Sequence, residues 1–366
     1  MIIYILVATV LFYVAYIAKG LRYQKKAYLC LSIMLVLFDG LRWESGTDWG
    51  NYYQYFTTCL MGDNSHFEVG YQTINRVVRS LTSSYTIFLL ILAVALYTCL
   101  GLFFKKNSVA PILSLALFFA LFVSYQGMNR QFIAICFCLI AYNCLEDKMN
   151  ICFIILVLIG SIFHITAFLF LLGLLIKKQL KNSTYILVVF ASIVLGNMGL
   201  VKTIIDLGID SLGPRVSLLL DFYSQQDLTS QSLIGMLFAY IRRLIILVPM
   251  LFYMKNNKLS MPMVLAFNYY FMGFIVYIMF NGTVLQVMVA RGNIYFMIFE
   301  CLLIPYLMYI YRKKLGRGLF FLLVYFGAIG NMVKGIQFYD VLGKGQNPFI
   351  PYKSLYYNTD IQKNTK

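Results

Sequence analysis

Long apolar stretches recur along the whole chain, and short basic loops separate most of them. Each stretch holds roughly twenty residues, the length a helix needs to cross the hydrocarbon core of a bilayer. A β-barrel would instead show alternating runs of about ten residues, and these stretches do not alternate. The pattern therefore predicts an all-α polytopic membrane protein with about 11–12 transmembrane helices. The predicted spans are residues 2–18, 27–41, 82–104, 109–125, 131–145, 151–176, 184–201, 233–254, 261–280, 292–311 and 319–336.

The basic loops predict the topology, because loops rich in lysine and arginine stay in the cytoplasm. With these loops inside, both ends of the chain lie outside. Residues 1–18 are then a retained helix rather than a signal peptide, and residues 1–337 form one polytopic domain. Its large outer segments are residues 42–81 and 202–232, and an aromatic outer tail follows at 338–366. The basic clusters lie at residues 19–26, 105–106, 148, 177–181, 255–258 and 312–317.

One predicted span, residues 151–176, has a basic loop at both of its ends. A single helix of this length would measure about 39 Å and could cross the membrane once with tilt. A single crossing would, however, invert the topology of every later loop. We therefore predict a broken, re-entrant pair of half-helices that meet near Ser161 to His164, where protein or a wet cavity surrounds the backbone. The alternative is one long helix with a local violation of the charge rule.

Composition narrows the classes of function. The chain is 61% hydrophobic and only 12% charged, whereas soluble domains are about 25% charged. The net charge of +16 is spread over the loops and forms no basic stripe, which argues against a nucleic-acid partner. The eight cysteines lie mostly within apolar runs. Neither they nor the acidic residues show the spacing of metal ligands, so we expect no metal and no cofactor.

Arginine is distributed differently from lysine. Arg42, Arg130, Arg215 and Arg291 all fall at the outer ends of predicted spans, where the positive-inside rule does not place basic charge. A guanidinium binds phosphate oxygens bidentately, so arginines beside apolar helix ends suit a phosphate-bearing lipid. Arg130 could instead be an interfacial arginine that snorkels to the membrane surface.

The first outer segment combines Arg42, a turn that contains Asp48, and a tyrosine cluster that includes Tyr52. Carboxylates accept hydrogen bonds from sugar hydroxyls, and aromatic rings stack on the C–H faces of sugars. The mixture is therefore typical of a carbohydrate site. The alternative is a capped loop whose Trp and Tyr residues belong to the aromatic belt.

The following residues, 67–79, place Val69, Ile74 and Val77-Val78 roughly on one face. This spacing predicts an amphipathic helix that lies on the outer leaflet. Glu68 at the start of this helix could be catalytic, or it could stabilise the helix dipole.

Two further positions carry candidate chemistry inside predicted spans. His164 lies at the predicted break, where it could hydrogen-bond a substrate or act as a base; a lone histidine on an apolar face can also be a satisfied core residue. Arg242 and Arg243 lie near the middle of their span, where charge normally pairs or faces a cavity. Glu300 is the expected partner of one of them. Adjacent helical side chains point about 100° apart, so one carboxylate is not expected to satisfy both.

Six short motifs, in order from residue 42 to residue 354, resemble those of the EpsG-like family of Wzy-type polysaccharide polymerases. Each motif alone is weak, whereas the series is fairly specific for the family. One departure is Thr166, where the family pattern commonly has Ser, and the hydroxyl is preserved. The motifs are Arg42 with Gly46-Thr47-Asp48 and Tyr52, Glu68 with Gly70-Tyr71, Asn129-Arg130-Gln131 with Ala134, Phe163-His164 with Thr166-Ala167, Arg291 with Tyr295, and Pro351-Tyr352-Lys353-Ser354.

The resemblance implies a helical fold akin to the GT-C glycosyltransferases. It also implies an undecaprenyl-diphosphate-dependent polymerase of O-antigen, capsule or exopolysaccharide repeats in the bacterial plasma (inner) membrane, with its active site facing outside. Expected partners are undecaprenyl-diphosphate-linked glycans, membrane lipids and a chain-length regulator protein, with no nucleic acid. The alternatives are an O-antigen ligase and a flippase for lipid-linked oligosaccharides. A transporter usually shows paired repeats, and this sequence shows none.

The hypothesis assigns roles to the outer residues. Arg130 and Arg291 would bind the diphosphate and stabilise the charge that grows on it as it leaves. His164 or Asp48 would be the base or would orient the acceptor. The candidate substrate-binding residues are Arg42, Tyr52, Glu68, Arg215, Tyr223 and Tyr352.

Overall fold

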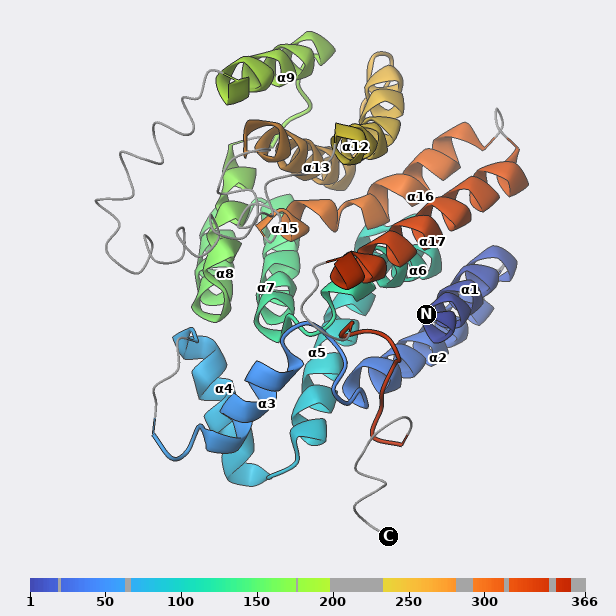
Figure 1. Ribbon diagram of the computed structural model, residues 1–366. Coiled ribbons are helices and arrows are strands. Elements are labelled where there is room, and N and C mark those ends of the chain that lie inside the picture. Colours follow the sequence, from blue (N-terminus) through green and yellow to red (C-terminus); the bar gives the residue numbers. More distant parts are fainter. Residues whose placement is uncertain are drawn as a thin grey trace. The chain divides into compact units, whose positions relative to one another are not determined.

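The computed structural model is all helical in the part of the chain that it describes, with a single isolated β-bridge between Arg42 and Ser354 (Figure 1). This confirms the predicted all-α polytopic class. The contacts divide the chain into two compact units: Met1–Phe168 with Ile304–Lys366, and Leu169–Leu303. The described residues are 1–18, 21–62, 67–175, 177–197, 233–280, 292–312, 316–341 and 347–356.

In its described residues, each predicted span is mainly helical, because a long apolar stretch in a bilayer must satisfy its backbone hydrogen bonds internally. Five described stretches are long and apolar enough to cross a membrane, and five more apolar helices are shorter. The first unit contains α1 (Ile2–Ile17), α2 (Leu21–Gly40), α5 (Tyr85–Asn107), α6 (Pro111–Phe122), η1 (Val123–Tyr125), α7 (Asn129–Glu146), α8 (Asn150–Phe163) and α17 (Arg317–Val341). The second contains α9 (Asn182–Asn197), α12 (Leu233–Met254), α13 (Met261–Phe280) and α15 (Ile294–Met297), and the unit boundary falls within η2 (Ile165–Leu174) and α16 (Glu300–Tyr311).

Among the described helices, the two helices of the α7–α8 hairpin pack together most extensively, and small residues allow this packing. A Cβ on Gly160 would lie 3.3 Å from the Ala134 carbonyl oxygen and 3.3 Å from the Phe137 Cβ. Further along, the rings of Phe137 and Phe163 stack with centroids 5.5 Å apart. The hairpin therefore fixes the end of α8 against the first turns of α7.

The predicted break in residues 151–176 is confirmed. The α-helix α8 ends at Phe163, and His164 has an extended backbone with φ −155° and ψ 117°. The chain then continues as the 3₁₀-helix η2 rather than as a second α-helix. That both basic loops flanking this pair lie on the same side of the membrane stays a prediction.

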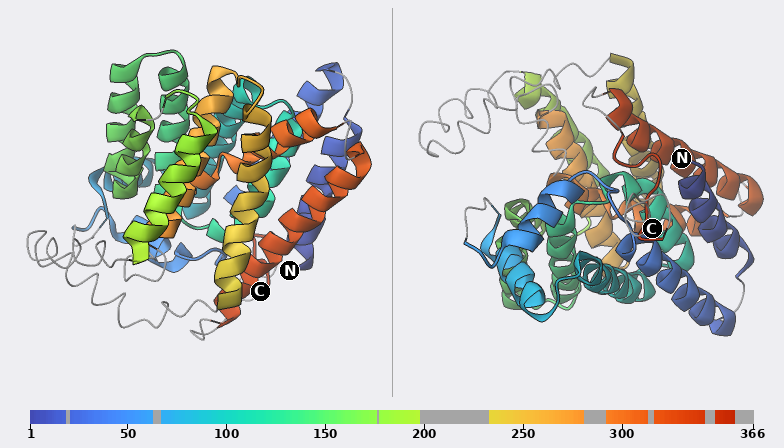
Figure 2. Two further views of the ribbon diagram at one scale, coloured as in Figure 1. Left: turned by 90° about the horizontal axis from the view of Figure 1, so that it is seen from above. Right: turned by 60° about the horizontal axis from the view of Figure 1, so that its bottom comes forward.

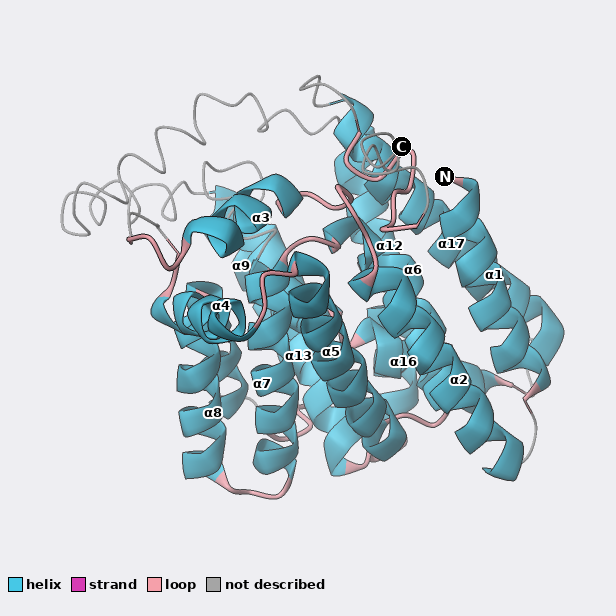
Figure 3. Cartoon of the chain, turned by 90° about the horizontal axis from the view of Figure 1, so that it is seen from below, coloured by secondary structure: helices cyan, strands magenta, loops and turns pink. Residues whose placement is uncertain are grey.

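Two short helices, α3 (Trp49–Thr58) and α4 (Val69–Leu81), lie across the ends of α5, α7 and α8 (Figures 1 and 3). That these helices lie on the outer side of the membrane stays a prediction. The predicted helix over residues 67–79 is confirmed as α4. The residues of α4 that are buried by the protein are Gly70, Tyr71, Asn75 and Val78, whereas Val69 is 68% exposed and Val77 is 54% exposed. That the apolar face of α4 lies on the outer leaflet stays a prediction.

Gly70 brings α4 close to α8. A Cβ at Gly70 would lie only 2.9 Å from the carbonyl oxygen of Ile162. Close approach of two backbones requires glycine at such a position. Hydrophobic periodicity depends on apolar side chains. It therefore gives no signal for a close backbone contact that glycine allows because it has no side chain.

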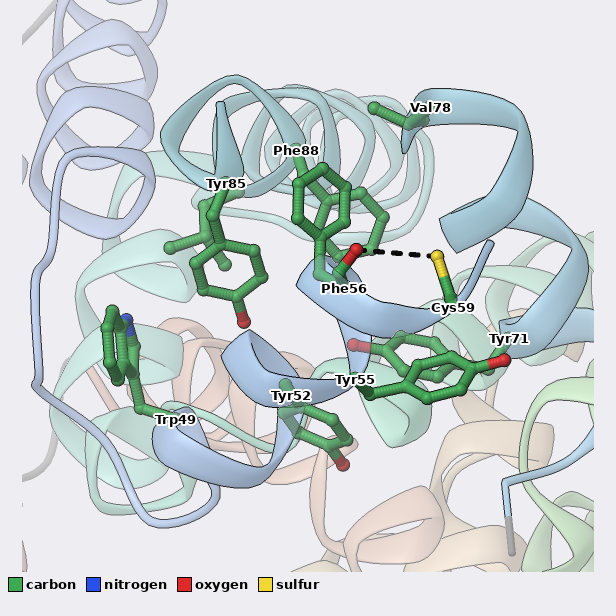
Figure 4. Close-up of a cluster of buried hydrophobic side chains, with 10 residues drawn as sticks. Trp49, Tyr52, Tyr55, Phe56, Cys59, Tyr71, Val78, Tyr85 and Phe88 are labelled. Atoms are coloured by element: carbon green, nitrogen blue, oxygen red, sulfur yellow. Dashed lines mark hydrogen bonds between the residues drawn. The ribbon is translucent and has the colours of Figure 1, made fainter. Parts of the chain in front are cut away.

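An aromatic cluster holds α3, α4 and the start of α5 together (Figure 4). Trp49, Tyr52 and Phe56 recur along α3 at helical spacing, so they share one face. Phe56 is fully buried and lies 5.2 Å, ring to ring, from Phe88 of α5. The rings of Tyr52 and Tyr71 lie 5.1 Å apart. These aromatic contacts hold α3 against α4 and α5, and they thereby fix the position of the Tyr52 hydroxyl.

The C-terminal tail, residues 347–356, returns to the beginning of the chain (Figure 2). The Trp43 N–H donates to the Lys353 carbonyl over 3.0 Å, and the Leu355 N–H donates to the Leu41 carbonyl over 2.9 Å. The hydroxyl of Tyr4 in α1 donates to the Phe349 carbonyl at 3.1 Å. These bonds tie the tail to the segment that follows α2.

Two glycines let the loop after α2 touch the loop before α7. Gly46 and Gly127 have φ of +105° and +106°, a region that favours glycine. A Cβ on Gly46 would lie 2.6 Å from the Gln126 carbonyl oxygen, and one on Gly127 would lie 2.7 Å from the Thr47 nitrogen. The Thr47 N–H donates to that Gln126 carbonyl at 3.2 Å. The contact places the motif of residues 46–48 beside the motif that begins at Asn129.

We expect Gly127→Ala to destabilise the protein. A non-glycine residue at this φ costs about 1–3 kcal/mol before the clash with Thr47 is counted. Gly50→Ala is the matched control, because Gly50 is helical and has no atom within 4 Å of its virtual Cβ. The midpoint of thermal unfolding in detergent should fall for Gly127→Ala and stay unchanged or rise for Gly50→Ala. Equal midpoints for the two variants would contradict the packing described here.

Candidate functional site

Arg42 lies in a buried polar network rather than in an open pocket. It follows the last turn of α2, and only 3% of its surface is exposed. Its Nη1 donates to the Asp39 carboxylate and, over 2.8 Å, to the Asp39 carbonyl oxygen. Its Nη2 donates to Oδ1 of Asn129 at 2.7 Å. The network thereby joins α2 to the first residue of α7.

Further hydrogen bonds complete the network. The Gln126 side-chain amide donates to the Asp39 carboxylate at 2.9 Å. Asn129 in turn donates to the Tyr85 hydroxyl at 3.5 Å. A buried carboxylate needs such donors, because an unpaired charge away from water is costly. Arg42 and Asp39 therefore fix the geometry around Asn129 and the adjacent Arg130.

Arg130, in the first turn of α7, is held in a clamp between α3 and the residue before α4. Its Nε donates to the Tyr52 hydroxyl of α3 at 3.1 Å, and its Nη1 donates to the carboxylate of Glu68, just before α4. The guanidinium also lies over the Phe67 ring at 4.8 Å. The side chains of Arg130 and Glu68 remain 20% and 23% exposed. The pair is thus reachable from outside, unlike Arg42 and Asp39.

Part of the clamp keeps hydrogen-bonding capacity for a ligand. Within the described residues, Nη2 of Arg130 and Oε1 of Glu68 have no hydrogen-bond partner. Burial by itself would lower the pKa of Arg130, but Tyr52 and Glu68 outweigh burial and raise it, so the guanidinium stays charged. Burial likewise raises the pKa of Tyr52 in spite of the nearby arginine, so its hydroxyl stays protonated. The site therefore offers fixed donors on one side and a carboxylate oxygen on the other.

Asp48 adds a second carboxylate close to the clamp. It precedes α3, and its carbonyl oxygen accepts from the Tyr52 N–H at 3.1 Å. Its half-buried carboxylate makes no hydrogen bond or ion pair with the described residues. One turn of α3 thus places Asp48 and Tyr52 on the same side of the site.

His164 lies at the junction of α8 with α4. Its Nδ1 is 2.6 Å from the Thr166 hydroxyl, which orients the ring. Two residues earlier, Ile162 contacts Gly70, which is itself two residues from Glu68. The extended backbone at His164 therefore places its half-buried ring beside the end of α8 that packs on α4.

The other candidates fall into two groups. Tyr352 is tied to the protein: its hydroxyl donates to the Phe38 carbonyl at 2.7 Å, and its ring stacks on that of Phe38 at 4.5 Å. Burial raises the pKa of Tyr352. A substrate-binding role for Tyr352 stays a prediction. Arg215, Tyr223 and Arg291 lie outside the described residues, as does the predicted outer segment 202–232.

Sequence reasoning missed Asp39 and Gln126, which hold Arg42 in place. The available signal was an acid near the end of predicted span 27–41, three residues before an arginine. It also missed Phe67, whose ring faces Arg130. No periodicity marks such a contact between residues far apart in the chain.

A comparison with protein-family models matches residues 25–354 to the EpsG family. The chain belongs to the EpsG family. The match covers all of the described clamp, from Tyr52 to Arg130, together with His164 and Tyr352. With its apolar helices, this EpsG-family protein is a multi-pass membrane protein with a role in exopolysaccharide production. No curated protein and no solved structure matches the chain, so the likeness to the GT-C glycosyltransferases stays a prediction.

Two arginines of the first unit, Arg42 and Arg130, should behave differently when removed. Arg42→Ala leaves the buried Asp39 carboxylate without its counter-ion. Breaking a buried ion pair in this way lowers the free energy of unfolding by about 3–5 kcal/mol. Arg130→Ala leaves Glu68 partly exposed, so water can solvate it. We therefore expect a large drop in thermal midpoint and in protein yield for Arg42→Ala and a small drop for Arg130→Ala. The reverse order would show that Arg42 is not the structural residue of the two.

Proposed function

We propose that this EpsG-family protein is a polysaccharide polymerase, a glycosyltransferase of the bacterial plasma membrane. It joins oligosaccharide repeat units carried on undecaprenyl diphosphate, at a site that faces the outside. Family membership and the membrane helices support the general role. The geometry around Arg130 supports the choice of chemistry.

The observation that carries the proposal is the Arg130 clamp. A charged guanidinium is held from two sides by Tyr52 and Glu68, and its remaining nitrogen is available to an incoming anion. Preorganised donors stabilise charge that develops in a transition state without further reorganisation. Arginine suits a diphosphate because its fork matches phosphate oxygens. Glu68, Asp48 and the surrounding rings supply the acceptors and the flat faces that sugars need.

The reaction that fits this arrangement is a displacement at an anomeric carbon. A hydroxyl of the acceptor repeat unit forms a new C–O bond to the anomeric carbon of the donor glycan. The bond from that carbon to the lipid diphosphate breaks, and the diphosphate leaves with the electron pair. The hydroxyl proton passes to a base, for which His164 is our assignment, with Asp48 orienting the acceptor hydroxyl. Arg130 stabilises the leaving group, and in this proposal Arg291 assists it.

Removing Arg130 should abolish polymer formation without removing the protein. We expect Arg130→Ala to lose at least about 100-fold in turnover, on the order of the loss of one preorganised donor. Purified protein is incubated with lipid-linked repeat units, and the products are separated by length. Arg76→Ala is the control, because it removes an arginine from the exposed side of α4. A normal ladder of products from Arg130→Ala at normal protein levels would refute the assignment.

The roles of His164 and Asp48 can be separated kinetically. Loss of a general base typically lowers turnover by about 10²–10⁴-fold. We expect His164→Ala to lower kcat by this order, with partial recovery on addition of imidazole. We expect Asp48→Asn to raise KM for the acceptor, with a smaller effect on kcat. If imidazole restores nothing and Asp48→Asn carries the loss in kcat, the two roles are exchanged.

The same assay distinguishes the alternative functions. A ladder of lengthening products indicates a polymerase, whereas a single transfer to lipid A core indicates an O-antigen ligase. Movement of the lipid-linked glycan between leaflets with no new glycosidic bond indicates a flippase. An arginine pair within a span, as in α12, would favour a transporter, because charged residues there can line a substrate pathway. In the structure Arg242 is paired with Glu300 at 2.7 Å, as the single acid in that region predicted.

A further inference from the structure

The second unit contains a buried arginine, Arg243, whose charge no acid among the described residues compensates. Arg242 and Arg243 are consecutive in α12, and Glu300 at the start of α16 faces them. Nη2 of Arg242 donates to Oε2 of Glu300 at 2.7 Å, and the Tyr270 hydroxyl donates to Oε1 at 3.1 Å. Both carboxylate oxygens are therefore engaged. Glu300 neutralises Arg242 and leaves the charge of Arg243 unmatched by the described residues.

The guanidinium of Arg243 is confined but only partly satisfied. Arg243 is 8% exposed. Its Nη1 donates to the carbonyl oxygen of Ala239 at 3.0 Å, and its Nε has no partner in the described part of the chain. The ring of Tyr277 in α13 lies beneath the guanidinium at 3.9 Å from its centroid. An aromatic face attracts a cation, but it accepts no in-plane hydrogen bond and supplies no full counter-charge.

The charged group lies closer to the end of α12 than the position of residue 243 suggests. Helical side chains point back toward the N-terminus, and the bond to Ala239 shows that Arg243 does so. Ala239 is six residues from Leu233, which corresponds to about 9 Å along the helix. Tyr277 lies three residues from Phe280, the last residue of the neighbouring helix α13. Both ends are opposite the basic loop of residues 255–258 and so face outward in the predicted topology.

A buried arginine in this position needs an anion as its counter-ion. Arginine does not lose its proton in proteins, so the charge cannot be removed by titration. A buried, uncompensated charge is strongly unfavourable unless a counter-ion joins it. The phosphate groups of lipids at the membrane surface are anions that suit a guanidinium near the end of a membrane-spanning helix. The unpaired Nε and the remaining Nη nitrogen form the edge that binds two phosphate oxygens at once.

We propose that Arg243, supported by the ring of Tyr277, is the anchor of a binding site for the phosphate or diphosphate group of a membrane lipid. Two sources share this chemistry: a lipid-linked diphosphate and an anionic phospholipid. The site does not require the glycosyl-transfer reaction proposed above, because the charge of Arg243 needs a counter-ion whatever reaction the protein performs.

The experiment uses the full-length protein in nanodiscs of phosphatidylcholine, which carries no net charge. Binding of undecaprenyl diphosphate and of phosphatidylglycerol is titrated separately by native mass spectrometry. Arg243→Met removes the charge and breaks no ion pair, so the variant should unfold at or above the wild-type temperature. Arg312→Met is the matched control: Arg312 also lies over a tyrosine ring, that of Tyr309 at 4.4 Å, but it is exposed.

We expect Arg243→Met to weaken the binding of at least one of the two lipids by tenfold or more, while Arg312→Met changes neither by more than about twofold. A loss confined to undecaprenyl diphosphate identifies the lipid-linked source, and a loss confined to phosphatidylglycerol identifies the phospholipid. Wild-type affinity for both lipids in folded Arg243→Met overturns the proposal.

Arg243→Lys is the second variant, for use if the methionine variant does not fold. It keeps the charge but lacks the planar fork, so it should bind the responsive lipid more weakly than wild type. Wild-type affinity in folded Arg243→Lys overturns bidentate binding by Arg243. The polymerase assay with Arg130→Ala tests the proposed reaction separately, so failure of the reaction and failure of this lipid site give different results.

Discussion

The buried ion pair between Arg42 and Asp39 is the constraint on which the arrangement around Arg130 depends. Two opposite charges are held largely away from water, and their mutual pairing and added hydrogen bonds offset the cost of burying them. Asn129 satisfies one end of the arginine, and Gln126 satisfies the carboxylate. The pair therefore determines where α2 ends and where α7 begins. It also fixes the segment to which the C-terminal tail is hydrogen-bonded.

Arg130 directly follows Asn129, so the buried network also fixes the backbone at Arg130. Tyr52 of α3 and Glu68, just before α4, contact its side chain. Those helices are positioned by an aromatic cluster and by a backbone contact at Gly70. A site assembled in this way is rigid before a ligand arrives, which is what electrostatic stabilisation of a leaving group requires.

Three arginines illustrate how environment decides the role of one residue type. Arg42 is buried with its acid and acts as a structural cross-link. Arg130 is partly exposed, is paired on one side and keeps donors for a ligand on the other. Arg243 is buried, stacked on a tyrosine and left without a compensating acid among the described residues. The sequence presents all three as arginines near helix ends or within spans, and only their partners distinguish them.

The sequence by itself determined the helical membrane class, the positions of the spans and the break at His164. These follow from local rules, because an apolar stretch in a bilayer must form a helix and a basic loop resists transfer across it. It also limited Glu300 to one arginine, since one carboxylate cannot face two adjacent helical side chains. Only the tertiary structure decided that Asp39 holds Arg42, that Tyr352 stacks on Phe38, and which face of α4 is buried. Those contacts join residues from different helices or depend on a glycine that brings two backbones together, and no local pattern encodes such pairings.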